Sequence, residues 1–183
     1  MQQNYKSVEA SQVVISELML PSHSNFNGKI HGGYILSLLD QIAFACASKH
    51  SRAYCVTASV DTVDFLRPIE IGELVTMKAS VNYVGRSSMV IGIRVESENI
   101  QTGDIKHCNS SYFTMVAKDK DGNSIHVPGL VLKSDDEIRR FAKSIKRKKM
   151  KDFRIKEYHE TDFASEKYLH ILEDHKVKIE MDL

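Results

Sequence analysis

Apolar and polar residues alternate with a period of two along much of the first 130 residues, which is typical of strands with one buried face. A first strand is predicted over 13–20, and later alternating segments lie at 56–61, 75–83, 89–95 and 107–117. Glycine and proline turn residues separate these segments, as at Arg67-Pro68, Gly72 and Gly85. Because the links between successive strands are short, we expect antiparallel pairing.

One long segment lacks this alternation. Residues 34–50 consist of good helix formers without proline or glycine, and they follow a loop over 22–33 that is rich in Ser, Asn and Gly. The predicted helix is apolar nearly all the way round, so we expect a sheet to enclose it on most sides. The pattern as a whole predicts an α+β fold, with an antiparallel sheet wrapped around one long central helix.

Charge density changes near residue 130. Of the 53 residues from 131 onward, 26 are charged, which divides the chain into a folded domain over 1–130 and a charged extension over 131–183. The segment from Ser134 to Lys151 begins with acidic residues and ends with basic residues. Acids near the start and bases near the end complement the helix dipole, so we expect a helix there. A second helix is predicted over 162–173. We interpret the basic run 146–151 as a solvated helix face, because nearby acids offset its charge.

Composition excludes several classes of protein. The formal charge of +1 predicts no strong binding to nucleic acid or to an anionic membrane, and no apolar run approaches the roughly 18 residues that span a bilayer. The N-terminus lacks the apolar core of a secretory signal. Cys46, Cys55 and Cys108 form no CxxC pair, which argues against a disulfide framework or a metal site. We therefore expect a cytoplasmic protein.

Asp40 is the one charged residue in the middle of the predicted helix. Burying an unpaired carboxylate costs roughly several kcal/mol or raises its pKa, and a pKa near neutrality suits a general base. The residues one turn away, Leu36 and Phe44, are apolar and favour this interpretation. The alternative, that Asp40 lies on a narrow exposed strip or bonds a loop, stays open.

Two glycines, Gly32 and Gly33, stand immediately before this helix. The first N–H groups of a helix have no partner within it, and glycine lets a ligand approach the backbone closely. Such donors suit a developing oxyanion. A simple helix-entry turn would also explain the pair, but Asn25 and Asp40 flank the same element and favour a site.

The order of these residues resembles the opening of the hotdog acyl-CoA hydrolase family. Asn25, Gly28, Gly32 and Gly33 fit its N-x-x-G-x-x-x-G-G pattern, and Asp40 follows as an acid two turns into the helix. Further segments match in order and at family spacing over roughly 10–130, namely 56–61, 65–69, 72–73, 85–89, 113–119 and 127–128. Single pieces would be weak signals, whereas the ordered set is specific.

The resemblance implies a hotdog fold and the hydrolysis of acyl-CoA. At the matching positions, Asp40 would be the general base or the nucleophile, and Asn25 would position the substrate or the attacking water. The backbone amides of Gly32 and Gly33 would polarise the thioester carbonyl. Neither a metal nor a bound cofactor is required, since coenzyme A (CoA) is part of the substrate.

The resemblance also implies where the substrate binds. Arg86, Ser87 and Ser88 of a G-R-S-S turn would contact the CoA nucleotide or its phosphates, as the paired donors of a guanidinium allow. Thr57 and His31 join this substrate-binding set, with His31 lining the pocket or packing the turn. A solvated hairpin arginine is the alternative for Arg86.

Family members pair two hotdogs back to back and often assemble three such pairs into a hexamer, so the resemblance implies a homo-oligomer. A site at the interface would take Asn25 and Asp40 from opposite subunits. A hotdog hydratase or dehydratase is one alternative function, but it typically needs a histidine with an acidic partner, and the helix offers none before His50. A non-catalytic acyl-CoA sensor is another, although it would have no use for a base.

Overall fold

The computed structural model describes residues 4–164, 167–172 and 175–180. It divides into two compact units, Met1–Ile145 and Lys146–Leu183, which are described separately below. Among the described residues, no helix is long and apolar enough to cross a membrane.

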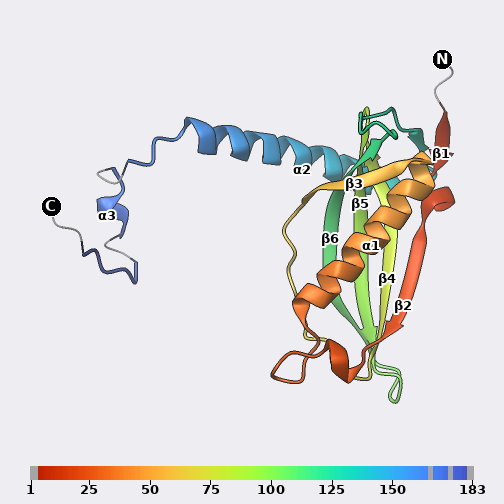
Figure 1. The fold of residues 1–183 in the computed structure, drawn as a ribbon, viewed down its shortest axis with the longest axis horizontal. Helices are drawn as coiled ribbons and strands as arrows, with labels where there is room; N and C mark the ends of the chain where they lie inside the picture. Colours follow the sequence, from red (N-terminus) through yellow and green to blue (C-terminus); the bar gives the residue numbers. More distant parts are fainter. Residues whose placement is uncertain (1–3, 165–166, 173–174, 181–183) are drawn as a thin grey trace. The chain divides into compact units, whose positions relative to one another are not determined.

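The first unit is built on a five-stranded antiparallel sheet in the order β2-β4-β5-β6-β3, with helix α1 lying across one face (Figure 1). The helix spans Gly32–Ser51. The strands are β2 (Val13–Leu18), β3 (Tyr54–Val60), β4 (Leu74–Val84), β5 (Ser88–Glu98) and β6 (Ile105–Lys118). This arrangement confirms the predicted α+β fold, and each of the five predicted strands is present.

The core lies between α1 and the sheet. The helix buries residues at spacings of three and four, so that one face is continuous: Ile35, Leu38, Leu39, Ile42, Ala43, Cys46, Ala47 and His50. The strands meet it with alternate residues, among them Val75, Met77, Val81, Met89, Ile91, Phe113 and Met115. Each fully buried Leu, Ile, Val or Met side chain contributes on the order of 1.5–3 kcal/mol, and this packing fixes the position of α1.

Two strands depart from the predicted alternation. In β4 an extra residue lies between Val81 and Tyr83, so Tyr83 pairs with Val90 and no longer continues the inward row. In β3 the fully buried residue is Cys55, and Thr57 shares its face because successive strand residues alternate between faces. Apolar Val60 is 44% exposed. The strand lies at the edge of the sheet, where burial in the single chain is weak.

Short elements complete the first unit. Strand β1 (Tyr5–Ser7) pairs in parallel with β7 (Gly129–Val131), and 3-10 helices cover Glu9–Ser11 (η1) and Pro21–His23 (η2). A side chain at Gly129 would place its Cβ 2.5 Å from the Tyr5 ring, so this pairing needs glycine there. Three-residue strands carry too little pattern to be predicted from alternation.

Helix α2 spans Asp135–Glu160, so the predicted helical extension is present and runs nine residues past Lys151. The predicted helix over 162–173 is wrong at its start, because residues 161–164 have no regular structure, and residue 173 lies outside the described residues. Helix α3 covers only Leu169–Leu172. Phe163 stacks on Tyr158 and Tyr168, with ring centroids 5.8 and 5.5 Å apart, which favours a bent segment between the helices.

Candidate active site

One stripe of α1 faces away from the sheet. Leu36 and Phe44 are 38% and 41% exposed, and Asp40, which lies between them, is also exposed. The prediction that the sheet encloses the helix on most sides is therefore wrong for the single chain. The physical reason is the width of the sheet, which covers only the continuous apolar face and leaves the stripe through Asp40 uncovered.

The Asp40 carboxylate borders a cleft of about 520 Å³ between α1 and the edge strand β3. Thr57 donates a hydrogen bond from Oγ1 to Oδ1 of Asp40 over 2.6 Å. Thr57 is held opposite Met115 of β6, and its hydroxyl lies 3.4 Å from the Met115 sulfur. The side chains of Phe44 and Tyr54 line the same cleft, with ring centroids 5.9 Å apart. The cleft thus offers one oriented carboxylate beside an apolar wall.

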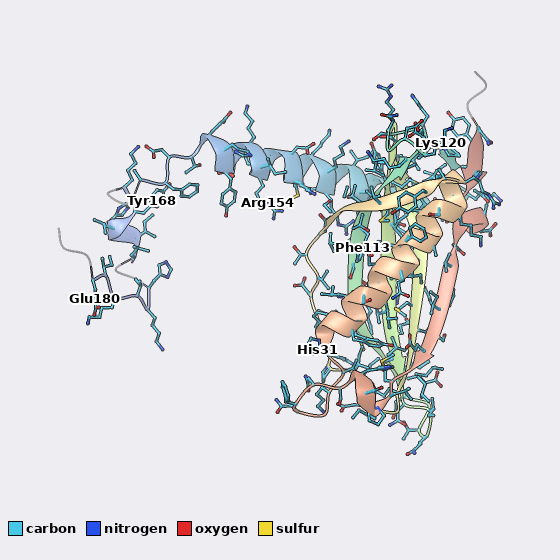
Figure 2. The ribbon with its side chains drawn as sticks, viewed as in Figure 1. His31, Phe113, Lys120, Arg154, Tyr168 and Glu180 are labelled. Atoms are coloured by element: carbon cyan, nitrogen blue, oxygen red, sulfur yellow. The ribbon has the colours of Figure 1, made fainter. Side chains whose placement is uncertain are left out.

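The N-terminus of α1 is capped by a histidine, which Figure 2 labels at the start of the helix. The imidazole Nδ1 of His31 accepts a hydrogen bond from the Gly33 amide over 2.9 Å. Gly32 packs against Phe65, since a Cβ at Gly32 would meet the ring at 3.4 Å. Of the two predicted amide donors, the Gly33 N–H is therefore occupied by His31, whereas Gly32, the first residue of the helix, has no intrahelical partner.

Asn25 lies in the loop that precedes the helix, and this loop orders its side chain. Oδ1 accepts hydrogen bonds from the amides of Asn27 and Lys29 over 2.9 and 3.2 Å. The loop is closed by a bond from the Asn25 amide to the Lys29 carbonyl over 2.7 Å. The Nδ2 amide, a donor, makes no hydrogen bond within the described residues. It is the part of Asn25 that remains for a ligand.

A second contact anchors this end of the helix. The Tyr34 hydroxyl donates a hydrogen bond to Glu17 on β2, and this bond, with partial burial, raises the pKa of Tyr34 to about 12. The Tyr34 ring stacks on His23 with centroids 4.0 Å apart, and the His23 carbonyl accepts the His31 amide over 2.9 Å. The loop and the first turn of α1 are therefore tied to each other and to β2.

One chain does not bring the whole predicted set together. Asp40 follows Gly33 by seven residues, a rise of about 10 Å along a helix at ~1.5 Å per residue. Within the described residues no hydrogen bond joins Asn25 to Asp40. The helix N-terminus and Asp40 therefore lie about two helical turns apart in the same protomer.

The G-R-S-S turn joins β4 to β5. The Gly85 amide donates to the Ser88 carbonyl over 2.7 Å, and the Ser87 carbonyl accepts the Ala117 amide over 2.9 Å. Arg86 is exposed, and its Nε donates to Nε2 of His126 over 3.1 Å. Sequence reasoning missed His126, because it stands 40 residues from Arg86 and no local spacing links the two.

The described residues do not support a cysteine nucleophile or a metal site. Burial raises the pKa of the Cys46 thiol to about 12, with Lys49 opposing the shift, so this sulfur is not a thiolate nucleophile. Within the part of the chain that the structure describes, no group of three His, Cys, Asp or Glu residues could hold a metal ion.

Comparison with known proteins gives a consistent set of relatives. A family model described as the thioesterase superfamily matches residues 27–103. Protein VdlD of Helicobacter pylori is 43% identical over 145 residues, which cover 79% of this chain and 83% of that protein. The uncharacterized acyl-CoA thioester hydrolase YkhA of Bacillus subtilis is 37% identical over 128 residues, covering 70% and 74%.

Solved structures that resemble this chain are also acyl-CoA thioesterases or hydrolases. A hexameric acyl-CoA thioesterase superposes with a TM-score of 0.81 at 34% identity, covering 83% of this chain and 97% of that one. An acyl-CoA hydrolase of Staphylococcus aureus in complex with butyryl coenzyme A gives a TM-score of 0.77 at 31% identity, covering 85% and 97%. Further structures of that enzyme carry alanine in place of a single aspartate, asparagine or threonine.

Proposed function

Since the chain belongs to the thioesterase superfamily, among the acyl-CoA hydrolases of hotdog fold, it is an acyl-CoA thioesterase, and we propose that Asp40 is the base of its reaction. The observation that carries this proposal is the exposed Asp40 carboxylate, held at a cleft by the Thr57 hydroxyl over 2.6 Å. A charge-assisted hydrogen bond of this length holds Oδ1 in place, and Oδ2 is the oxygen that would accept a proton from water in this proposal.

The reaction needs little from the protein, because a thioester is already an activated acyl group. Asp40 takes a proton from water as the water oxygen bonds to the carbonyl carbon. The carbon–sulfur bond then breaks, CoA leaves as its thiolate, and the proton held by Asp40 passes to that sulfur. Donors placed at the carbonyl oxygen stabilise the charge that develops there.

These donors come from a second copy of the chain in this proposal. The helix N-terminus lies about 10 Å from Asp40 in one protomer, so the Asn25 Nδ2 and the Gly32 amide of the partner face the Asp40 cleft. The Gly33 amide joins them when the His31 ring turns away. The three alanine variants of the Staphylococcus aureus enzyme support the set, because their asparagine, aspartate and threonine have the same separations in that chain as Asn25, Asp40 and Thr57 have here.

The exposed stripe of α1 and the neighbouring edge of the sheet suit such a partner. Strand β3 pairs only with β6 among the described strands, and an unpaired edge is a template for another chain. Tyr54 and Val60 on this edge are 62% and 44% exposed. The protein is therefore a homo-oligomer in this proposal, a dimer of hotdogs, and three dimers would give the hexamer seen in its structural relatives.

The turn between β4 and β5 provides further contacts to the CoA part of the substrate in this proposal. Arg86 binds a phosphate of the CoA nucleotide, and the Ser87 and Ser88 hydroxyls provide further polar contacts in the turn. The three cysteines are free and buried, which fits the reducing environment of the cytoplasm. No bound cofactor enters the reaction.

A thiol-release assay tests the proposal. Purified full-length protein is mixed with CoA esters of increasing acyl length, and free CoA is followed with a thiol reagent. We expect turnover with saturated acyl-CoA esters, and the profile of rates against length identifies the preferred chain. Stoichiometric binding of acyl-CoA without thiol release would instead support a sensor, and hydration of an enoyl-CoA with the thioester intact would support a hydratase.

A further inference from the structure

The second unit contains a stretch of helix whose charge differs from that of the rest of the chain. Residues 146–160 of α2 carry seven basic and three acidic side chains, a net charge of +4, whereas the whole chain carries +1. The other residues therefore carry a net charge of −3. The charge of the whole chain, from which we expected no strong binding to an anionic membrane, does not show this local concentration of positive charge.

The acidic residues at the start of α2 offset little of this charge. Asp136 already pairs with Arg139 and Arg140 in the first turns of the helix. It precedes Lys146 by ten residues, a rise of about 15 Å along the helix, which exceeds the ~8 Å over which physiological salt screens exposed charges. The basic segment therefore presents most of its charge to a binding partner.

One face of this segment combines basic and apolar side chains. Met150 and Phe153 are three residues apart, which places them on the same side of the helix, and they are 62% and 68% exposed. Lys146, Lys149 and Arg154 each lie four residues from one of these two, so they flank the apolar pair. The three cations are exposed and form no ion pair within the described residues. We call these five residues the basic patch, and Figure 2 labels Arg154 among them.

An apolar pair flanked by cations suits the surface of an anionic bilayer. Lipid phosphates attract Lys and Arg, and the boundary between headgroups and acyl chains takes up side chains such as Met and Phe. A nucleic-acid duplex would also attract the cations, but its phosphate backbone gives Met150 and Phe153 nothing apolar to contact. A second copy of the patch would bring like charges together, which disfavours self-association through this face.

We propose that the basic patch docks the protein on the surface of an anionic membrane. Its three cations lie at the lipid phosphates, and Met150 and Phe153 insert at the boundary between headgroups and acyl chains. Such peripheral binding needs no membrane-spanning helix. The inference goes beyond the proposed function and does not depend on it, because no residue of the patch lines the Asp40 cleft. For a thioesterase, docking would release a fatty acid beside the bilayer in which long acyl chains dissolve.

Co-sedimentation of the full-length protein with lipid vesicles tests the docking. Vesicles of equal parts phosphatidylglycerol and phosphatidylcholine are compared with vesicles of phosphatidylcholine alone. We expect binding to the anionic vesicles only, and weaker binding as salt is added, because salt screens exposed charges. Lys149→Gln should weaken binding about fivefold, the scale for one basic residue at such a surface. Lys120→Gln removes one exposed charge from a turn of the first unit, and this matched control should bind as the wild type does.

Tryptophan fluorescence tests the insertion, because the chain contains no tryptophan. In Phe153→Trp the indole emission should shift to shorter wavelength with anionic vesicles, since an aromatic ring at the interface leaves water. Ile100→Trp, at a position that is 56% exposed in the turn after β5, should show no shift. Phe153→Ala should weaken sedimentation about tenfold or more, the scale for one buried aromatic side chain. Thermal unfolding of each variant shows whether the fold is kept.

Several results would overturn the proposal. One is the failure of wild-type protein to sediment with anionic vesicles, and another is equal sedimentation with phosphatidylcholine vesicles. An equal loss of binding in Lys149→Gln and Lys120→Gln would attribute the binding to the net charge of the protein and not to the patch. Unshifted emission from Phe153→Trp on sedimented vesicles would contradict insertion, and binding of a fluorescent DNA duplex in place of vesicles would assign the patch to nucleic acid. None of these results bears on acyl-CoA hydrolysis in solution, which tests the proposed function separately.

Discussion

At the scale of single residues, the candidate site rests on the pair formed by Asp40 and Thr57. The carboxylate is exposed in one protomer, so its orientation comes from the Thr57 hydroxyl and not from burial. The hydrogen bond to Oδ1 holds the carboxylate in one orientation at the cleft. Thr57 in turn is fixed by its place opposite Met115 in the sheet.

Replacing Thr57 tests this orientation. In Thr57→Ala we expect kcat for acyl-CoA hydrolysis to fall about ten- to a hundredfold, because a hydrogen bond to a charged group is worth ~1.5–3 kcal/mol. Thr57→Ser keeps the hydroxyl and should retain most of the rate. Steady-state kinetics on the three proteins measure the effect, and equal rates for alanine and serine variants would show that the hydroxyl has no role.

Sequence reasoning identified Asp40, Asn25 and the Gly32-Gly33 pair, because each stands out locally or in the family pattern. The roles given to them stay predictions. The partners of these residues were harder to find. The contact between Asp40 and Thr57 joins α1 to the edge strand β3. The alternation over 56–61 places Thr57 on the face opposite to the apolar residues Val56 and Val60, so the pattern alone favours the wrong face. Only the three-dimensional register places Thr57 toward the helix.

At the scale of elements, the N-terminus of α1 is the part of the site that most depends on backbone geometry. His31 caps the helix through Nδ1, and a Cβ added at Gly33 would lie 3.1 Å from that imidazole ring. In the proposed mechanism the same Cβ would stand where the thioester carbonyl approaches the Gly32 and Gly33 amides. The His31 imidazole and the carbonyl of the substrate would therefore occupy the same space beside Gly33.

Gly33→Ala should therefore lower kcat/KM for acyl-CoA about tenfold or more, because the added methyl group crowds the approach of the carbonyl to the amides. The imidazole can shift by a few tenths of an ångström, so we expect little loss of thermal stability. Gly28→Ala in the same loop is the comparison, since its positive φ of 73° makes it a stability variant with no predicted place at the carbonyl. Wild-type rates in Gly33→Ala would remove the amides from the mechanism.

The elements themselves were predicted well where their period was long and regular. The five strands and the long helix follow from alternation and from helix propensity, as β4 and α1 illustrate. The bulge between Val81 and Tyr83 could not be predicted. The alternation of apolar and polar residues continues through Tyr83, so the sequence gives no sign of the extra residue. The extent to which the sheet covers α1 was overestimated. An apolar stripe on a helix indicates burial, but it does not distinguish burial by a sheet from burial by a partner chain.

At the scale of the whole molecule, a buried histidine ties the ends of the first unit together. His50 closes α1, and its Nε2 lies 3.0 Å from the Pro128 carbonyl before β7. Its own carbonyl accepts the Lys6 ammonium of β1 over 2.6 Å. Burial lowers the pKa of His50; the Pro128 carbonyl opposes this shift, and Lys6 adds to it.

This lowered pKa predicts how stability depends on pH. The unfolded chain binds the proton first as the pH falls below the ordinary value of 6.5, so the free energy of unfolding should decrease there. Urea unfolding at pH 7.5 and pH 5.5, compared between wild type and His50→Gln, measures the contribution. The variant should lose less stability on acidification, and the same loss in both proteins would exclude His50 as the cause.

The assembly of the site across two chains is tested by mixing variants. Asn25→Ala and Asp40→Ala are each expected to be inactive alone. In a mixed dimer, one of the two sites receives an unsubstituted Asn25 from one chain and an unsubstituted Asp40 from the other. Co-expression in equal amounts should restore about a quarter of the wild-type sites, from random pairing in a two-fold dimer. No recovery would show that both residues act within one chain.

The most direct test of the account is the rate of acyl-CoA hydrolysis by Asp40→Asn, measured as free thiol released under saturating substrate. The amide keeps the size of the side chain and can still accept from Thr57, but it cannot take a proton from water. We predict a loss in kcat of at least about a hundredfold, the scale of general base catalysis, with unchanged thermal stability and oligomeric state. Turnover at the wild-type rate in that variant would contradict the account.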